Sequence, residues 1–490
     1  MMSTNPSIDT FIETSPSYLR EAIYCCATPY WFQEPLAIKI IESFVKAEHS
    51  AQDMFYQLLD LPFIYNHDEA TWQYTDDARN KILASLAAEE NKSKFKAVHT
   101  LIANEIKSQL KTLVENGHAD LPQGDQQTDF NSWQVRRLRW QLIYHLAPND
   151  PEQAYNEFEA IAKWANKKRD RLPMFKLAAE AWEKQARWLN TYKEEGAYYQ
   201  GYFAYKMDDF ARAENLFSLV WLGGVKDILM KADAGHLLGV IYRQKGQSKW
   251  IEEAEEILRE SLGILENENK ENKEVIQLKA RILNTLGATL VQTSSFVEQT
   301  KAQKKFDEAR KLLQESLRIQ QDVLNDDYGS THVLNTLATL YLKFDGDANV
   351  YRAMEFIERS LELLPEGYEQ DEMIHLNTKA EVLIKRGKKA DLDEAEELLL
   401  RCLTVNRKIH DRRTEAISRS KLARVYYGRG DNESLQSAIE YLRRSLKLWE
   451  ELDNLIAQKE CMELFANTFD QLDQPEQASF WRRRSFQMNS

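Results

Sequence analysis

Apolar residues recur along the second half of the chain in the pattern of paired helices. The clearest segment is residues 334–338 (Leu-Asn-Thr-Leu-Ala), with close copies that begin at Leu283 and Leu376 and a looser one at Ser420. Each copy is followed by apolar residues at helical spacing around one alanine. These alanines are spaced by 44, 42 and 43 residues, and they are Ala309, Ala353, Ala395 and Ala438. A fixed period of this size predicts an array of repeated helical pairs.

The first ninety residues have a different pattern. Apolar spacing predicts three helices, at residues 17–27, 33–47 and 51–60. Two β-like runs follow, at 63–65 and 71–74, and the polar residues between them favour a hairpin turn. The acidic segment 75–77 then favours the start of another helix. This order resembles the winged-helix module of signal-transducing nucleotidases, where it lies between the nucleotide-binding unit and a helical sensor array.

The repeats resemble those of the tetratricopeptide family, which pairs a first helix containing Leu-Gly/Ala-x-x-Tyr with a second containing Ala-x-x-x-Phe-x-x-Ala. One repeat here has Leu337-Ala338 and Tyr341, followed by Ala353 and Ile357. Small residues at these positions allow the two helices to cross closely. The period of about 42 residues exceeds the usual 34. It is similar to the kinesin light chain type and to the sensor arrays of signalling nucleotidases.

We therefore predict an all-α protein, with a right-handed superhelical tetratricopeptide solenoid of helical hairpins after a small winged-helix-like domain that holds a short β-hairpin. The resemblance to the tetratricopeptide family covers residues 132–487. The expected parts are a disordered lead (1–16), the winged-helix-like domain (17–90), a helix and linker (91–131), degenerate helical repeats (132–193) and the repeat array (194–487).

The charge of the chain argues against general binding to nucleic acid. Asp and Glu outnumber Lys and Arg by 77 to 64, which gives a formal net charge of −13. Residues 1–115 hold 10 Lys and Arg against 16 Asp and Glu. The helix expected at 51–60 would be the recognition helix of a DNA-binding winged helix, and it has Asp53 and Asp60 but no basic residue. Backbone phosphates require the opposite charge.

The four cysteines (Cys25, Cys26, Cys402 and Cys461) have no metal-ligand spacing, which favours free thiols in a reducing compartment. No uncharged apolar run reaches the roughly 18 residues that a membrane span requires. We therefore expect a cytoplasmic protein that has no membrane contact.

Sequence motifs of catalysis are missing. Gly196 and Gly201 have the spacing of a phosphate-binding loop, but Tyr202 stands where a lysine must reach the phosphates. Neither His-Glu-x-x-His nor Gly-x-Ser-x-Gly occurs. We expect no enzyme, no cofactor and no metal.

Asparagine recurs at one position of the first helix in three repeats, as Asn284, Asn335 and Asn377. In the tetratricopeptide family this position faces the concave groove. Similarly placed asparagines of the kinesin light chain type hydrogen-bond the backbone of an extended peptide. An amide both donates and accepts, so it suits a peptide unit whatever the side chains. The alternative interpretation is that each amide bonds within its own helical pair.

Other candidates for the same surface lie at equivalent or nearby positions of the predicted first helices. Ser420 and His236 take the place of the asparagine in neighbouring repeats, and Arg424 lies one turn further along. Arg243 and Tyr427 follow near the ends of their helices. These five residues complete the predicted peptide-binding face of the array.

Tyr198 and Tyr202 belong to a cluster of aromatic residues on one predicted helix. Five large rings cannot all be buried along one helical stripe, so an exposed anchor site is one interpretation. Packing against an additional helix at 172–190 is the other.

The predicted function is binding, with an extended peptide or a protein surface held in the concave face of the array. One alternative is a ligand-responsive transcription regulator whose winged helix binds DNA. Another is a sensor subunit split from a signalling nucleotidase system. The oligomeric state and the identity of the partner stay open.

Overall fold

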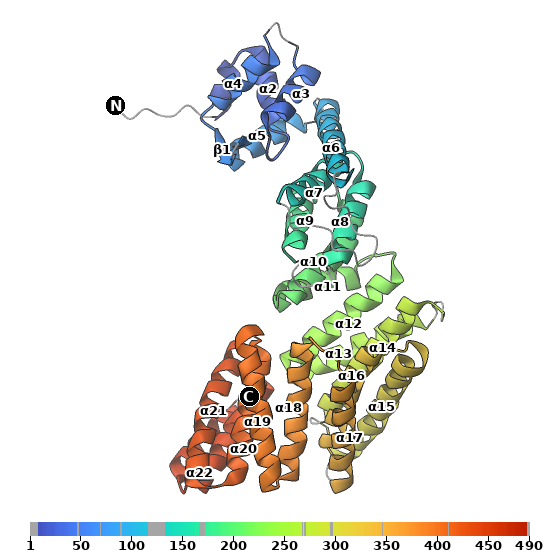
Figure 1. Cartoon of the computed structure of the whole chain (residues 1–490), viewed down its shortest axis with the longest axis vertical. Helices are drawn as coiled ribbons and strands as arrows, with labels where there is room; N and C mark the ends of the chain where they lie inside the picture. The colour runs from blue at the N-terminus through green and yellow to red at the C-terminus, as the bar shows by residue number, and fades with distance from the viewer. Residues whose placement is uncertain are drawn as a thin grey trace. The chain divides into compact units, whose positions relative to one another are not determined.

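The computed structural model describes residues 8–46, 49–68, 70–88, 91–115, 133–165, 172–266, 268, 271–294, 297–344, 346–409 and 411–487. The chain forms two compact units, residues 1–216 and residues 217–490. Helices dominate both units, and the one sheet in the described residues has two strands (Figure 1). The protein is therefore all-α, as predicted.

The order of elements predicted for residues 17–90 is confirmed. Helices α2 (Ser17–Cys26), α3 (Glu34–Phe44) and α4 (Ala51–Leu59) precede strands β1 (Ile64–Asp68) and β2 (Thr71–Tyr74), and α5 (Asp76–Leu86) follows them. The strands are antiparallel, with Ile64 opposite Tyr74. A short helix, α1 (Ile8–Thr14), lies where the sequence suggested a disordered lead, and the described part of that segment is held by the buried side chain of Ile12.

Local sequence explains where these elements begin and how they pack. The Ser50 hydroxyl accepts a hydrogen bond from the Asp53 amide at 3.0 Å, so it caps the start of α4. In the core, the fully buried Tyr74 donates its hydroxyl to the Ile23 carbonyl at 3.1 Å, which ties β2 to α2. The sheet and the three helices therefore share one interior.

The remainder of unit 1 is a series of helices, and the helix predicted at the start of the 91–131 segment is among them. The elements are α6 (Lys92–Glu115), α7 (Trp133–Leu146), α8 (Pro151–Ala165), α9 (Leu172–Lys184), the short 3-10 helix η2 (Asn190–Tyr192), α10 (Lys193–Lys206) and α11 (Phe210–Leu222), whose last residues fall in unit 2. The linker predicted in the remainder of that segment, residues 116–131, lies outside the described residues.

Unit 2 is a tetratricopeptide-like solenoid of six helical pairs in the described residues. Its first helices are α12 (Ile228–Lys245), α14 (Lys273–Thr293), α16 (Asp327–Leu342), α18 (Glu369–Arg386), α20 (Arg412–Arg429) and α22 (Leu455–Gln471). Its second helices are α13 (Ser248–Leu265), α15 (Gln299–Arg318), α17 (Asp347–Leu363), α19 (Lys389–Ile409), α21 (Asn432–Glu451) and α23 (Pro475–Gln487). Each first helix packs most extensively against its own second helix (Figure 1). The predicted repeat architecture is confirmed.

Small residues lie where the two helices of a pair cross, as the repeat pattern indicated. A Cβ atom added to Gly239 would lie 2.6 Å from the Leu258 Cγ atom, and one added to Gly287 would lie 2.7 Å from Leu313. The four alanines that define the period, Ala309, Ala353, Ala395 and Ala438, are completely buried. Close approach of the two backbones is therefore the physical basis of the repeat.

Candidate peptide-binding face of the array

The first helices form the inner side of the array. Consecutive first helices pack against each other along unit 2, from α12 with α14 to α20 with α22, whereas consecutive second helices do so far less. An array whose members approach more closely on one side curves towards that side. The exposed surface of the first helices is therefore the concave face of the array.

Asn284 and Asn335 share one feature on this face. Each side chain is half-buried, on α14 and α16 respectively, and each amide oxygen Oδ1 is buried without a hydrogen-bond donor from the described residues. A buried acceptor that lacks a donor raises the free energy of the folded state. Each oxygen is closed to solvent in this conformation, so a ligand N–H group would reach it only after the half-buried side chain turns outward. That hydrogen bond would then remove the penalty.

Asn377 is placed differently from the other two asparagines. Its side chain is only 3% exposed, and its Nδ2 donates to the Met373 carbonyl at 2.8 Å and to the Ser418 hydroxyl at 3.0 Å. The Ser418 hydroxyl lies 3.1 Å from Asn377 Oδ1, so the amide already joins α18 to α20. Asn377 thus fits the interpretation in which the amide bonds within the array, whereas Asn284 and Asn335 leave the interpretation as ligand contacts open.

His236 also joins neighbouring first helices. Its Nε2 atom lies 3.0 Å from the Thr285 hydroxyl, and its Nδ1 atom lies 3.4 Å from Asp233. Burial is the main cause that lowers the pKa of His236. The order of carboxylate, imidazole and hydroxyl is that of a hydrolase triad. However, none of the three side chains is more than 9% exposed, so the hydroxyl is closed to a substrate and the group connects α12 with α14.

Ser420 faces a polar cluster inside the array. Its hydroxyl lies 2.6 Å from the Ser445 hydroxyl and 3.5 Å from the Cys461 sulfur, and it accepts a hydrogen bond from the Trp449 indole at 3.3 Å. These partners come from α21 and α22. Ser420 therefore stabilises the packing of the last repeats.

Arg424 belongs to a group of charged side chains that sequence reasoning found only in part. Lys421 Nζ lies 2.8 Å from the Glu381 carboxylate, and Arg424 lies 3.7 Å from it and 3.1 Å from Glu460. Burial alone would raise the pKa of Glu381, but the two cations outweigh it and lower that pKa to about 2. The sequence pattern did not single out Lys421, because this residue stands one position beyond that of the repeated asparagine. Only its neighbour Ser420 matched the pattern.

The remaining predicted residues do not join these groups. Arg243, in the last turn of α12, and Tyr427, in α20, are both half-buried. Tyr198 and Tyr202 lie in unit 1, on α10, with their ring centroids 6.3 Å apart. In the same cluster, the ring of Phe203 contacts that of Phe175 on α9 at 5.1 Å, so the added helix does pack against part of it.

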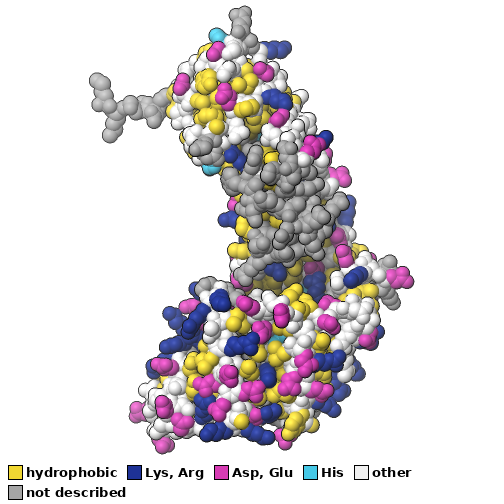
Figure 2. Space-filling model, viewed as in Figure 1, with side chains coloured by type: hydrophobic (Ala, Val, Ile, Leu, Met, Phe, Trp, Pro, Cys, Tyr) yellow, Lys and Arg dark blue, Asp and Glu magenta, His cyan; other side chains and the backbone are white. Residues whose placement is uncertain are grey.

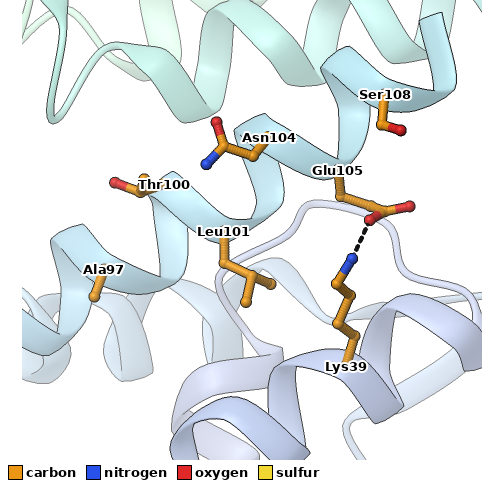
Figure 3. A pocket seen from close by; sticks show the side chains of 7 residues that line it. All are labelled: Lys39, Ala97, Thr100, Leu101, Asn104, Glu105 and Ser108. Atoms are coloured by element: carbon orange, nitrogen blue, oxygen red, sulfur yellow. Dashed lines mark hydrogen bonds and ion pairs between the residues drawn. The ribbon is translucent and has the colours of Figure 1, made fainter.

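A shallow hollow on unit 1 lies outside the array. It has a volume of about 660 Å³ between α3 and α6, and the Lys39 ammonium crosses it to the Glu105 carboxylate at 2.5 Å (Figure 3). The hydrogen bond from Lys39 is the main cause that lowers the pKa of Glu105. The lysine and the carboxylate thus satisfy each other.

The described residues also bear on metal binding and membrane insertion. They hold no group of three or more His, Cys, Asp or Glu side chains arranged to bind a metal ion. Among the helices they form, none is sufficiently long and apolar to cross a bilayer.

Comparison with known proteins gives similarity to solved structures alone, since no family model and no curated protein matches. A Rap protein complexed with competence and sporulation factor is 14% identical, over 73% of this chain and 98% of that one, with a TM-score of 0.46. A signal transduction ATPase with numerous domains and a tetratricopeptide repeat sensor, from Pyrococcus horikoshii, is 12% identical over 99% of this chain and 66% of that one, with a TM-score of 0.42. At these values the similarities carry no argument about what this chain binds.

Proposed function

We propose that this chain is a non-enzymatic binding protein whose array holds an extended peptide, or an extended segment of a protein, on the concave face. The observation that carries this proposal is the pair of buried, unsatisfied amide oxygens of Asn284 and Asn335. They occupy the same position of consecutive repeats, on first helices that pack against each other. Two equivalent acceptors along one face favour a ligand that presents repeated donors.

An extended peptide has that property. Its backbone advances by roughly 3.3–3.6 Å per residue and offers one N–H and one C=O group at each step. A side-chain amide can accept from the N–H through Oδ1 and donate to the C=O through Nδ2. Binding of this kind tolerates many peptide sequences, because it engages the backbone and leaves specificity to other contacts.

The charged group on the same face influences which side chains fit. Glu381 is already paired with Lys421 and Arg424, so a ligand side chain that reaches this group meets two cations for one carboxylate. Glu460 pairs with the far side of Arg424. The face therefore does not demand a strongly charged ligand, and peptide-backbone contacts dominate recognition.

Peptides selected from a random library by binding to the intact parent chain provide the probe. Their affinity for the parent and for Asn284→Ala, Asn335→Ala and the double variant is measured by calorimetry. Each substitution should weaken binding by about 0.5–1.5 kcal/mol, the net contribution of one hydrogen bond. Thermal stability should be unchanged or slightly raised, because removal of an unsatisfied buried acceptor relieves a penalty and alanine favours a helix.

Asn377→Ala is the matched control for this experiment. It deletes an amide from the equivalent position, but here the amide bonds to Met373 and Ser418 inside the array. We expect a lower melting temperature and unchanged affinity for the selected peptides at a temperature where the variant is folded. The proposal fails if the double variant binds the peptides as tightly as the parent does.

A further inference from the structure

The two ends of the array touch each other. The Gln244 carbonyl, at the end of α12, accepts a hydrogen bond from the Arg413 guanidinium at 3.3 Å and another from Asn454 Nδ2 at 3.3 Å. Arg413 lies in the first turn of α20 and Asn454 immediately precedes α22, so they lie 169 and 210 residues further along the chain than Gln244. The first helical pair of unit 2 is thus connected directly to the fifth and the sixth.

The residues at this contact fit closely. Gly246, which ends α12, has a φ of 71°, and a Cβ atom at this position would lie 2.9 Å from the Asn454 side-chain oxygen. Asn454 is 6% exposed, and that oxygen accepts from the Ala457 amide at 3.0 Å, which caps α22. The Asn454 side chain therefore both caps α22, in the sixth helical pair, and contacts α12, in the first.

In a solenoid each repeat contacts mainly its neighbours, so the curvature is set by many small rotations and the array is deformable along its length. A contact that skips three repeats removes this freedom, because α12 can no longer move away from α20 and α22. We propose that the Gln244–Arg413–Asn454 contact is a releasable latch that holds the array in one closed turn, and that its release widens the concave face for entry and exit of the partner.

The character of the contact favours release over permanent closure. It consists of polar groups at helix ends, and its two hydrogen bonds are slightly longer than the usual 2.7–3.2 Å range. Elsewhere α12 packs mainly against α13 and α14 within the array. Closure itself is independent of the function proposed above, whereas the role in partner access rests on that function.

Two glycines provide a matched pair of variants. Gly246→Ala places a methyl group against Asn454, whereas Gly430→Ala places one in open space at the equivalent end of α20. Their φ angles are 71° and 75°, so both substitutions impose the same backbone strain. Any difference between the two variants therefore reports the latch.

Double electron–electron resonance measures the distance between two spin labels, one on Glu256→Cys in α13 and one on Lys447→Cys in α21. This distance increases if the array opens. Both positions are exposed, while the four natural cysteines are buried, so labelling is selective. We expect a longer and broader distance distribution for Gly246→Ala, and the parent distribution for Gly430→Ala. Asn454→Ser is the second test, because serine still caps α22 but is too short to reach Gln244, and it should also open the array.

Dissociation of the library-selected peptides then tests whether the latch controls access of the partner. We expect the dissociation rate from Gly246→Ala to be at least several-fold higher than that from Gly430→Ala. Equal distances in Gly246→Ala, Asn454→Ser and the parent would overturn the latch, whatever the outcome for the asparagines. Longer distances with unchanged dissociation would overturn the role in partner access. Failure of the proposed function is separately visible, since it appears as unchanged affinity in the Asn284 and Asn335 double variant.

Discussion

The Nδ1 atoms of His99 and His145 lie 3.0 Å apart in the interior of unit 1, where each imidazole serves as partner to the other. Both side chains are completely buried. The groups that act on them electrostatically are Arg79 and Arg187 for His99, and His99 and then Arg79 for His145. Burial and these positive charges lower the pKa of His99 to about 3 and that of His145 well below its usual value. The pair therefore links α6 to α7 in the neutral state.

Unit 1 should lose stability in acid because of this pair. The unfolded chain binds protons at its histidines below a pKa of about 6.5, whereas the folded chain does not until about pH 3 for His99. The stabilising contribution is therefore complete above about pH 6.5 and falls as the pH falls through that window, by up to about 1.4 kcal/mol per pH unit for each histidine. Hydrogen exchange of α6 and α7 at pH 7 and pH 5 measures the loss.

The double variant His99→Gln, His145→Gln should show a smaller difference between the two pH values than the parent. Exposed His67 offers the control, because His67→Gln removes a histidine from the same unit without touching the buried pair. An equal pH dependence in the parent and the double variant would show that other groups govern the acid sensitivity of this unit.

The close crossing of helices in the array can be tested with two helical glycines of one repeat. Gly239→Ala should destabilise unit 2 by about 1–3 kcal/mol, because its methyl group would overlap Leu258, which is fully buried and has little room to move. Gly263→Ala, on α13, meets nothing within 4 Å and should stabilise the protein by up to about 1 kcal/mol through helix propensity. Denaturant titration compares the two, and a stabilising Gly239→Ala would contradict the packing described here.

Sequence periodicity could predict the fold because the repeat depends on local features. Ala353 and Gly239 must be small wherever two helices cross, and that requirement appears in the sequence at a constant interval. The environment of each amide could not be predicted in this way. Asn335 and Asn377 stand at the same position of similar motifs, but only Asn377 has a serine, Ser418, on the next first helix within reach.

Contacts that depend on the curvature of the whole array were also beyond sequence reasoning. The bond between Gln244 and Asn454 spans 210 residues, and nothing in either local motif indicates the other. The buried pair His99 and His145 comes from two separate helices, and scattered histidines give no periodic signal. Local packing rules thus predict the helices. Which polar groups come into contact depends on how all the helices are arranged together.

Acidic side chains surround helix α4 in the N-terminal part of unit 1. Asp53, on α4, and Asp60, which directly follows this helix, are exposed. Glu34, on α3, lies beside this helix and accepts hydrogen bonds from Gln52 at 3.2 Å and from Tyr56 at 3.4 Å. In the view of Figure 2, acidic and basic side chains are interspersed over this part of the molecule, without a continuous basic stripe on the visible face.

DNA binding through α4 is therefore disfavoured, because three carboxylates would face phosphate groups without counter-charge. We expect no binding of duplex DNA by the intact chain in a mobility-shift titration at low salt, where electrostatic attraction is strongest.

The variant Asp53→Lys, Asp60→Lys serves as the positive control, since reversal of both charges should produce weak, salt-sensitive binding if this face can approach DNA at all. Tight binding by the parent that weakens steeply with salt and maps to residues 17–90 would reverse the conclusion and favour a transcription regulator. Absence of binding by the parent, together with binding by the charge-reversed variant, would show that charge and not shape keeps this winged-helix-like unit from DNA.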